Sequence, residues 1–236
     1  MKFPKPLSIV MITYNEEDHI EGLIREFYRE IYLNAPKGSE YIIYLDRPTD
    51  STPKIVRALA KKLKLKVIEG KENLGYAKST TKALLATKND VVFYADSSGK
   101  HNAKDFWKLA KYEENYDIVT GLRYPRFDPR IRRVTAIAQR LIICTLFLIP
   151  FYDFNTGYKL LHRNIIRDVL LDCKYMKQSF SSELLIRAYK KGFTIGSVPV
   201  NFCDRKEKGT GTRYKDLPPI IWGSLKGFIR LRLELL

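Results

Sequence analysis

Short apolar runs of strand length alternate with stretches of helical periodicity through the first half of the 236-residue chain. We predict strands at residues 7–13, 41–45, 66–68, 91–95 and 117–120. The first four are each followed by a helical pattern, and the first helix is expected to open at Tyr14 to Glu17, with its acidic residues in the first turn. This alternation predicts the α/β fold class, with a mostly parallel sheet, right-handed crossovers and helices on both faces.

Asp96 directly follows the most apolar of these strands and is followed by Ser97, Ser98 and Gly99. In open α/β sheets, ligands bind in the crevice outside the carboxyl ends of the strands. A carboxylate at that place is suited to hold a metal ion or a sugar hydroxyl. The alternative is a purely local role, because Asp and Ser also cap turns and helices.

The common phosphate-binding signatures are missing from the sequence. No Gly-x-Gly-x-x-Gly follows the first strand, and no Gly-x4-Gly-Lys-Ser/Thr occurs. A bound nucleotide would therefore be held by another arrangement. Three widely spaced cysteines, Cys144, Cys173 and Cys203, support neither a disulfide framework nor a zinc site, so we expect a reducing, intracellular compartment.

The formal net charge of +16 favours anionic partners such as nucleic acid, phosphorylated metabolites or an anionic membrane, unless the lysines only form a solvated surface. Arginines cluster between residues 123 and 140, where Asp128 is the only acidic residue. The guanidinium group suits bidentate contact with phosphate. The cluster comprises Arg123, Arg126, Arg130, Arg132, Arg133 and Arg140.

From about Arg130 the same segment is predicted to be an amphipathic helix, with Arg133 and Arg140 on one face. The other face is apolar and comprises Ile131, Val134, Ala138, Leu141, Thr145 and Leu148. Such a helix is typical of a membrane interface. A solvated charged helix lying over an ordinary core is the alternative.

A second amphipathic helix is predicted from Pro218 to the C-terminus, with Lys226, Arg230 and Arg232 among its apolar residues. Its apolar face comprises Trp222, Leu225, Ile229, Leu233 and Leu236. The longest uncharged run, residues 141–152, is too short to span a bilayer, which needs roughly 18 residues. We therefore expect a peripheral protein that binds the cytoplasmic face of an anionic membrane.

An ordered set of motifs resembles the family 2 glycosyltransferases of the GT-A fold, over about residues 5–215. The motifs are Thr-Tyr-Asn-Glu at 13–16, Asp-Arg-Pro-Thr-Asp-Ser-Thr at 46–52, Asn-Leu-Gly at 73–75, the Asp96 stretch, Asp-Phe-Asn-Thr-Gly-Tyr-Lys-Leu at 153–160, Glu183, and Val-Pro-Val at 198–200 leading to Arg205. Within the family, the chain looks most like the dolichyl-phosphate mannose synthase type. The resemblance implies inverting transfer of a sugar, with GDP-mannose favoured as donor, to polyprenyl or dolichyl phosphate.

The resemblance also implies roles for particular residues. Asp96, Arg123 and Glu183 would be catalytic, with Glu183 orienting an arginine, because a phosphate nucleophile needs no deprotonation. The nucleotide sugar would contact Thr13, Tyr14, Glu16, Asp46, Gly75, Lys78 and Asp96. The acceptor phosphate would contact Arg123, Arg132, Arg133 and Arg205, and the segment 209–212 resembles the family's mobile loop.

The chain departs from the family pattern at the metal motif, where Ser98 replaces the second carboxylate of Asp-x-Asp. Asp96 and Ser98 would still hold Mg²⁺ or Mn²⁺, more weakly, with help from the donor diphosphate. Ile12 and Leu45 also replace the proline and the aspartate that are usual in the family.

Residues 1–213 are expected to form the catalytic domain and residues 214–236 an amphipathic extension. Two other functions stay open from the sequence, a glycosyltransferase with a saccharide acceptor and a non-catalytic binder of nucleotide sugars. No aromatic and basic motif supports nucleic-acid binding.

Overall fold

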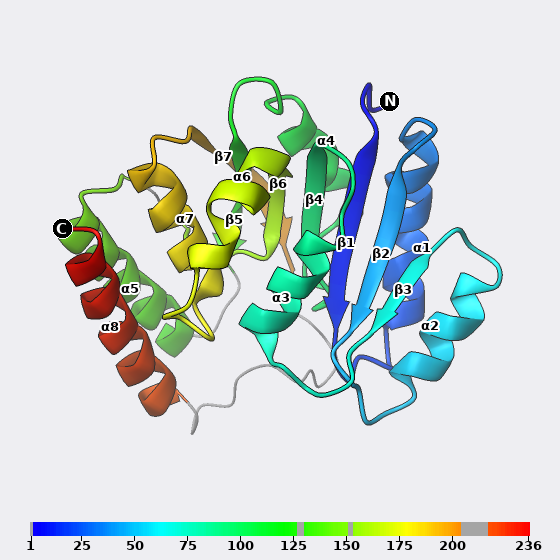
Figure 1. The fold of residues 1–236 in the computed structure, drawn as a ribbon. Coiled ribbons are helices and arrows are strands. Elements are labelled where there is room, and N and C mark those ends of the chain that lie inside the picture. The colour runs from blue at the N-terminus through cyan, green and yellow to red at the C-terminus, as the bar shows by residue number, and fades with distance from the viewer. Residues whose placement is uncertain (1, 127–129, 151–152, 204–216) are drawn as a thin grey trace.

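The computed structural model describes residues 2–126, 130–150, 153–203 and 217–236 (Figure 1). Seven strands form one sheet in the order β3-β2-β1-β4-β6-β5-β7. They are β1 (Leu7–Thr13), β2 (Glu40–Leu45), β3 (Lys66–Glu69), β4 (Val91–Asp96), β5 (Ile118–Arg126), β6 (Tyr158–His162) and β7 (Ile195–Phe202). Strand β6 is antiparallel to both β4 and β5, and the other pairs are parallel. The predicted mostly parallel α/β sheet is confirmed.

Helices cover both faces of the sheet, as predicted (Figure 1). They are α1 (Ile20–Glu30), α2 (Thr52–Ala60), α3 (Tyr76–Leu85), α4 (Phe106–Ala110), α5 (Arg130–Phe147), α6 (Arg163–Asp168), α7 (Phe180–Lys190) and α8 (Leu217–Glu234). The apolar residues of α1, α2 and α4 share one core, and those of α3, α5, α6, α7 and α8 share the other. Every residue of β1 and β2 is buried, as expected for strands enclosed between two helical layers.

Two predicted boundaries were wrong, and the first of these errors lies next to the cleft described below. Helix α1 begins at Ile20 rather than near Tyr14, because Asn15 takes a left-handed conformation with φ of 50°. The backbone amide of Glu16 instead donates to Thr52 Oγ1 at 2.8 Å. Strand β5 continues past Gly121 to Arg126, because it pairs with β7 over that length.

The C-terminal helix α8 is present and packs beside α5 (Figure 1). Phe228 and Leu231 of α8 are buried, and the rings of Phe147 and Phe228 lie 6.5 Å apart. At its C-terminal end, Glu234 accepts a hydrogen bond from Arg187 Nη1 at 2.9 Å. The proposed boundary between residues 213 and 214 lies outside the described residues and stays a prediction.

The apolar face predicted for α5 does not pack against the protein. All six of its residues are exposed, including Val134 at 63% and Leu141 at 61%, and the core is instead contacted by Ile143 and Phe147. On α8, Trp222 is likewise 59% exposed. Within the described residues, no helix combines the length and the apolar character needed to cross a bilayer.

Candidate active site

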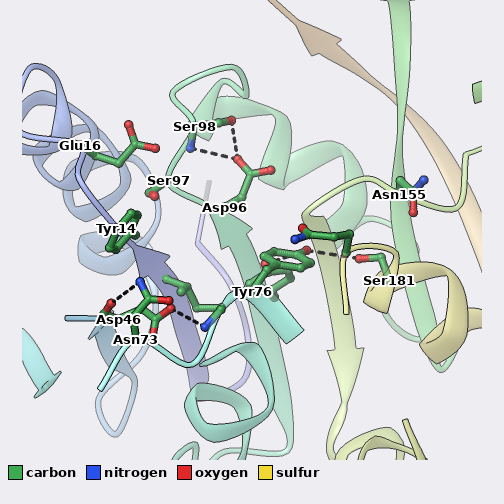
Figure 2. Close-up of a pocket in the computed structure, with 14 residues that line it drawn as sticks. Tyr14, Glu16, Asp46, Asn73, Tyr76, Asp96, Ser97, Ser98, Asn155 and Ser181 are labelled. Atoms are coloured by element: carbon green, nitrogen blue, oxygen red, sulfur yellow. Dashed lines mark hydrogen bonds between the residues drawn. The ribbon is translucent and has the colours of Figure 1, made fainter. Parts of the chain in front are cut away.

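A cleft of about 640 Å³ lies at the carboxyl ends of β1, β2 and β4 (Figure 2). These parallel strands end at the same edge of the sheet, so the residues that follow them are brought together. Most of its lining residues have polar side chains. The lining residues are Ile12, Tyr14, Glu16, Asp46, Asn73, Gly75, Tyr76, Tyr94, Asp96, Ser97, Ser98, Asn155, Gln178 and Ser181.

Asp96 is held in place by the residues around it. Its Oδ1 atom accepts hydrogen bonds from Ser98 Oγ at 2.5 Å and from the Ser98 amide at 3.1 Å (Figure 2). Its backbone amide donates to the carbonyl oxygen of Gly157 at 2.8 Å. Within the described part of the chain, Oδ2 accepts no hydrogen bond and is available to a ligand.

The two candidate metal ligands fit a divalent cation only in part. In residues 2–126, 130–150, 153–203 and 217–236, no group of three or more His, Cys, Asp or Glu side chains has metal-binding geometry. Asp96 supplies one carboxylate. Ser98 donates its proton to Asp96 and accepts a long hydrogen bond from the Lys100 amide at 3.4 Å, which leaves one lone pair of its oxygen for a cation. Mg²⁺ is often bound by one or two carboxylates together with substrate phosphates and waters. Asp96 and Ser98 are therefore suited to a cation that the bound substrate helps to hold.

Asp46 positions the loop that starts helix α3. Its two carboxylate oxygens accept from the backbone amides of Leu74 at 2.8 Å and Gly75 at 2.9 Å. Gly75, with φ of 74°, is the residue before α3 and lines the cleft together with Tyr76, so the amino end of this helix lies at the cleft. A helix N-terminus carries partial positive charge and attracts phosphate. Lys78 of the first turn is exposed and does not line the cleft.

The segment after β1 forms the opposite wall. Tyr14 and the buried Glu16 line the cleft, whereas Thr13 is buried beneath it. His19 joins this wall, since its Nε2 lies 3.6 Å from Glu16 Oε2 and 2.7 Å from the Ser97 carbonyl oxygen.

Of the four predicted phosphate-binding arginines, the structure describes the side chains of Arg123 and Arg133. Arg123 makes a bidentate ion pair with Asp153, with Nε–Oδ2 and Nη2–Oδ1 distances of 2.6 and 2.8 Å. It does not line the main cleft but lines a cavity of about 20 Å³ with Arg140 and Asn155, and Asn155 also lines the cleft. Arg133 is exposed on α5.

The side chains of the other residues that were predicted to bind phosphate are not described by the structure. The Arg132 side chain, Arg205 and the segment 209–212 lie outside the described residues. Their predicted contacts with phosphate stay predictions.

Glu183 is buried away from the cleft. Its carboxylate accepts from the backbone amides of Lys174, Tyr175 and Met176 at 2.8 to 3.0 Å. It also pairs with Arg187, at a distance of 3.0 Å between Nε and Oε1. The carboxylate thus orders a loop and an arginine of its own helix, and we do not place it at the reacting atoms.

Several lining residues were missed by the sequence analysis. Tyr94 donates to Tyr76 OH at 3.0 Å. Tyr76 OH in turn lies 3.5 Å from Ser181 Oγ (Figure 2). Tyr76 directly follows the Asn-Leu-Gly motif, which was a usable signal. Gln178 and Ser181 had none, because only the tertiary fold brings the start of α7 to the ends of the other strands.

An apolar groove of about 310 Å³ adjoins the cleft between α5, α8 and the start of α7. Asn155 and Gln178 line both the groove and the cleft. Its apolar wall comprises Ala138, Ile142, Ile220, Ile221, Leu225 and Phe228. A neighbouring hollow of about 370 Å³ beside α8 is lined by Lys177, Lys226 and Arg230, among others.

Several known proteins are similar to this chain in sequence. Residues 8–185 match the sequence profile described as glycosyl transferase family 2. A dolichyl-phosphate hexose transferase of Haloferax volcanii is 29% identical over 204 residues, which is 84% of this chain and 83% of that protein. A dolichyl-phosphate beta-glucosyltransferase of Dictyostelium discoideum is 24% identical over 217 residues, covering 84% of this chain and 66% of that protein.

Solved structures show a similar fold. The UDP complex of glucosyl-3-phosphoglycerate synthase from Mycobacterium tuberculosis has a TM-score of 0.74 at 18% identity, over 97% of this chain and 80% of that one. A complex of that enzyme with Mn²⁺, UDP and phosphoglyceric acid has a TM-score of 0.72, also at 18% identity, over 97% of this chain and 78% of that one.

Proposed function

The chain belongs to glycosyl transferase family 2, and from that premise we propose that it transfers a hexose from a nucleotide-diphosphate sugar to a polyprenyl or dolichyl phosphate. The observation that carries this proposal is that two unlike cavities share part of their lining. A polar cleft at the strand ends and an apolar groove between α5 and α8 meet at Asn155 and Gln178. A phosphorylated donor suits the first cavity, and an isoprenoid chain suits the second.

The donor half of the proposal rests on the cleft. Its volume of about 640 Å³ lies within the usual range for a ligand site, which is about 300–1,000 Å³. The amino end of α3 offers backbone N–H groups to a diphosphate. Asp96 and Ser98 would hold Mg²⁺ or Mn²⁺, which when bound neutralises charge that develops on the leaving diphosphate.

The acceptor half rests on the groove and on its neighbours. An acceptor phosphate placed near Asn155 would lie between the donor cleft and the cavity that Arg123 and Arg140 line. Fixed cations there would reduce its repulsion from the donor diphosphate. The names of the two relatives, which are transferases acting on dolichyl phosphate, support the same acceptor class.

In the proposed reaction, an acceptor phosphate oxygen attacks the anomeric carbon as the bond to the leaving nucleoside diphosphate breaks. One C–O bond forms and one breaks, which inverts the configuration. A phosphate whose second pKa is about 6 is already anionic at neutral pH and needs no strong base. This chemistry is consistent with a Glu183 carboxylate that is occupied by backbone amides.

We also propose that the protein acts as a peripheral protein at the cytoplasmic face of a membrane. The exposed apolar face of α5 and the exposed Trp222 of α8 support this, since side chains of this kind insert at the boundary of headgroups and acyl chains. Lys226 and Arg230 would add attraction to anionic lipid. Co-sedimentation with liposomes tests the proposal, and equal recovery in the supernatant with and without anionic lipid would refute it.

The identities of the hexose and of the nucleotide are the most specific part of the proposal. The resemblance favours GDP-mannose, whereas the names of the relatives specify a hexose and a glucose. Both GDP-mannose and UDP-glucose therefore belong in the first assay.

The decisive assay offers each donor to the purified protein with polyprenyl phosphate in detergent, or with oligosaccharides, and separates the products by lipid extraction. We expect a labelled hexose only in the lipid fraction. The Asp96→Asn variant should not produce it. Glu114→Gln is the matched control, because this exposed carboxylate lies far from the cleft. Transfer to saccharides with none to lipid would contradict the proposed acceptor.

A further inference from the structure

Lys159 is a lysine buried in the middle of the sheet. Its side chain is 1% exposed, and in the strand register it lies between Tyr94 of β4 and Thr120 of β5. Within the described residues it forms no ion pair with a carboxylate, since none is found within 4 Å of its ammonium group. Burying a charge without a paired counter-ion is costly, so such residues concentrate at functional sites.

Two hydrogen bonds use part of the donor capacity of the Lys159 ammonium group. The Nζ atom donates to the carbonyl oxygen of Thr156 and to Ser181 Oγ, the latter at 3.1 Å. An ammonium has three donors. Nearby in the strand register, the buried hydroxyl of Thr120 has no hydrogen-bond partner in the described structure. The ammonium is therefore surrounded by polar groups, and part of the hydrogen-bonding capacity of this region is unused.

The hydrogen bonds continue from Lys159 to the cleft. Ser181 Oγ lies 3.5 Å from Tyr76 OH, which accepts a hydrogen bond from Tyr94 OH at 3.0 Å. Ser181, Tyr76 and Tyr94 all line the cleft, whereas Lys159 lies behind them. Ser181 Oγ accepts from the ammonium and itself donates to the Thr156 carbonyl oxygen at 3.3 Å. A neutral amine can also accept, so the charge on Lys159 influences which way Ser181 donates.

Several charges around the cleft act on the same ammonium. Burial lowers the pKa of Lys159 to about 7, Asp153 and Asp96 raise it, and Arg123 lowers it. Arg123 and Asp153 are paired with each other, so Asp96 is the nearby carboxylate without an arginine partner in the described structure. Tyr76, Tyr94 and His101 are the other titratable groups around this space. Their own pKa values are shifted toward the neutral form, chiefly by burial.

We propose that Lys159 is a positioning residue of the donor site, which fixes the hydroxyl groups of Ser181 and Tyr76 and balances the charge of a nucleoside diphosphate bound beside Asp96. The inference rests on the proposed function only in the chemical class of this ligand. An anion in the cleft favours the protonated lysine, so binding above neutral pH is coupled to proton uptake. Lys159 does not touch the ligand and acts through Ser181.

The test is isothermal titration of UDP and GDP with Mn²⁺ at pH 8, in two buffers of different ionisation enthalpy, which counts the protons taken up. The wild-type chain should take up a fraction of a proton with the nucleotide that it binds. Lys159→Met should lose this uptake and bind about tenfold more weakly, a loss that corresponds to one hydrogen-bonded charge. Its melting temperature should not fall, because replacing a buried charge by an apolar group is often neutral or stabilising.

Two further variants separate positioning from packing. Lys159→Arg keeps the charge, so it should bind more tightly than Lys159→Met but without proton uptake, because arginine stays protonated. Ser181→Ala breaks the connection to the cleft and should weaken binding while proton uptake persists. If uptake persists in Lys159→Met but disappears in His101→Gln, the proton belongs to His101 and the inference is overturned.

The outcomes also separate the inference from the proposed function. A wild-type chain that binds a nucleotide with proton uptake but transfers no hexose to lipid would refute the function and keep the inference. If Lys159→Met binds and takes up protons like the wild type, the inference fails although the function stands. Should Lys159→Met not fold, the wild-type titration still decides, since binding without uptake between pH 7.5 and 8.5, or no binding at all, overturns the inference.

Discussion

Gly157 lies so close to Asp96 that a Cβ atom on this glycine would come within 2.5 Å of Asp96 Oδ2. The two residues are also joined through the backbone, because the Asp96 amide donates to the Gly157 carbonyl at 2.8 Å. The absence of a side chain at position 157 therefore allows the cleft carboxylate to occupy its observed place. This explains in physical terms why a glycine stands in the middle of the Asp-Phe-Asn-Thr-Gly-Tyr motif.

Gly157→Ala should displace the Asp96 carboxylate and lower kcat/KM for hexose transfer by about 100-fold, since a shift of about 1 Å at a reacting site has an effect of that order. Circular dichroism and the melting temperature should show a folded protein. Gly22→Ala is the matched control, because a Cβ on that exposed glycine meets nothing within 4 Å. Similar rates for Gly157→Ala and the wild type would mean that the position of Asp96 is unimportant.

Asp96→Asn should lower kcat on the order of 10²–10³-fold, because it removes the charge that would hold a cation against the leaving diphosphate. Ser98→Asp tests the same site in the opposite direction. It would supply the second carboxylate of the usual motif and should lower the Mn²⁺ concentration needed for half-maximal activity. An Asp96→Asn variant with full activity would remove Asp96 from the mechanism.

Val134→Asp and Leu141→Asp on α5 should each weaken binding to anionic liposomes without destabilising the fold. Both side chains are exposed, so the folded protein loses no packing. Burial of such a side chain contributes about 2 kcal/mol, or about 30-fold in partitioning. Ile143→Asp would instead unfold the protein, since Ile143 is in the core. Unchanged co-sedimentation of both surface variants would argue against insertion of α5.

The contact between Glu234 and Arg187 should stabilise the docked position of α8 in a pH-dependent manner. Hydrogen bonds from Arg187, Tyr175 and Lys174, of which that from Arg187 has the largest effect, lower the pKa of Glu234 from 4.5 to about 2. A lowered carboxyl pKa adds stability that is complete above about pH 4.5 and is lost as the pH falls toward 2.

Thermal unfolding of the wild type and of Glu234→Gln at several pH values measures this effect. The difference in melting temperature should be constant between pH 5 and 7 and should shrink below about pH 4.5. A difference that grows on acidification would have the wrong sign and would contradict the assignment.

Local signals in the sequence were sufficient to predict β1 to β5, and with them Asp96 at the end of β4, but β6 and β7 were not predicted. The structural role of the Glu183 carboxylate could not be predicted from local signals. Its carboxylate binds the amides of a loop whose position depends on the packing of α7, which no local pattern encodes. The apolar face of α5 was predicted from its spacing, but only the structure reveals that this face is exposed.

Long-range pairing explains the other differences. Strand β5 extends to Arg126 because β7, from much later in the chain, pairs with it. Lys159 has the spacing of an ordinary strand residue, and its burial follows from its place between β4 and β5. Sequence patterns therefore predicted which strand ends form the cleft, but not which side chains from the second half of the chain complete it.

We propose that the polar cleft and the apolar groove act as one site for two substrates. Ala138→Trp tests it most directly, because this exposed residue of α5 lines the groove but not the cleft, and Thr145→Trp is the control from the same helix outside the groove. The measurement is the KM for polyprenyl phosphate beside the Kd for the nucleotide. We predict that Ala138→Trp raises this KM by about tenfold or more while the nucleotide Kd stays unchanged. An unchanged KM for polyprenyl phosphate, with transfer to lipid intact, would contradict the assignment of the groove to the acceptor.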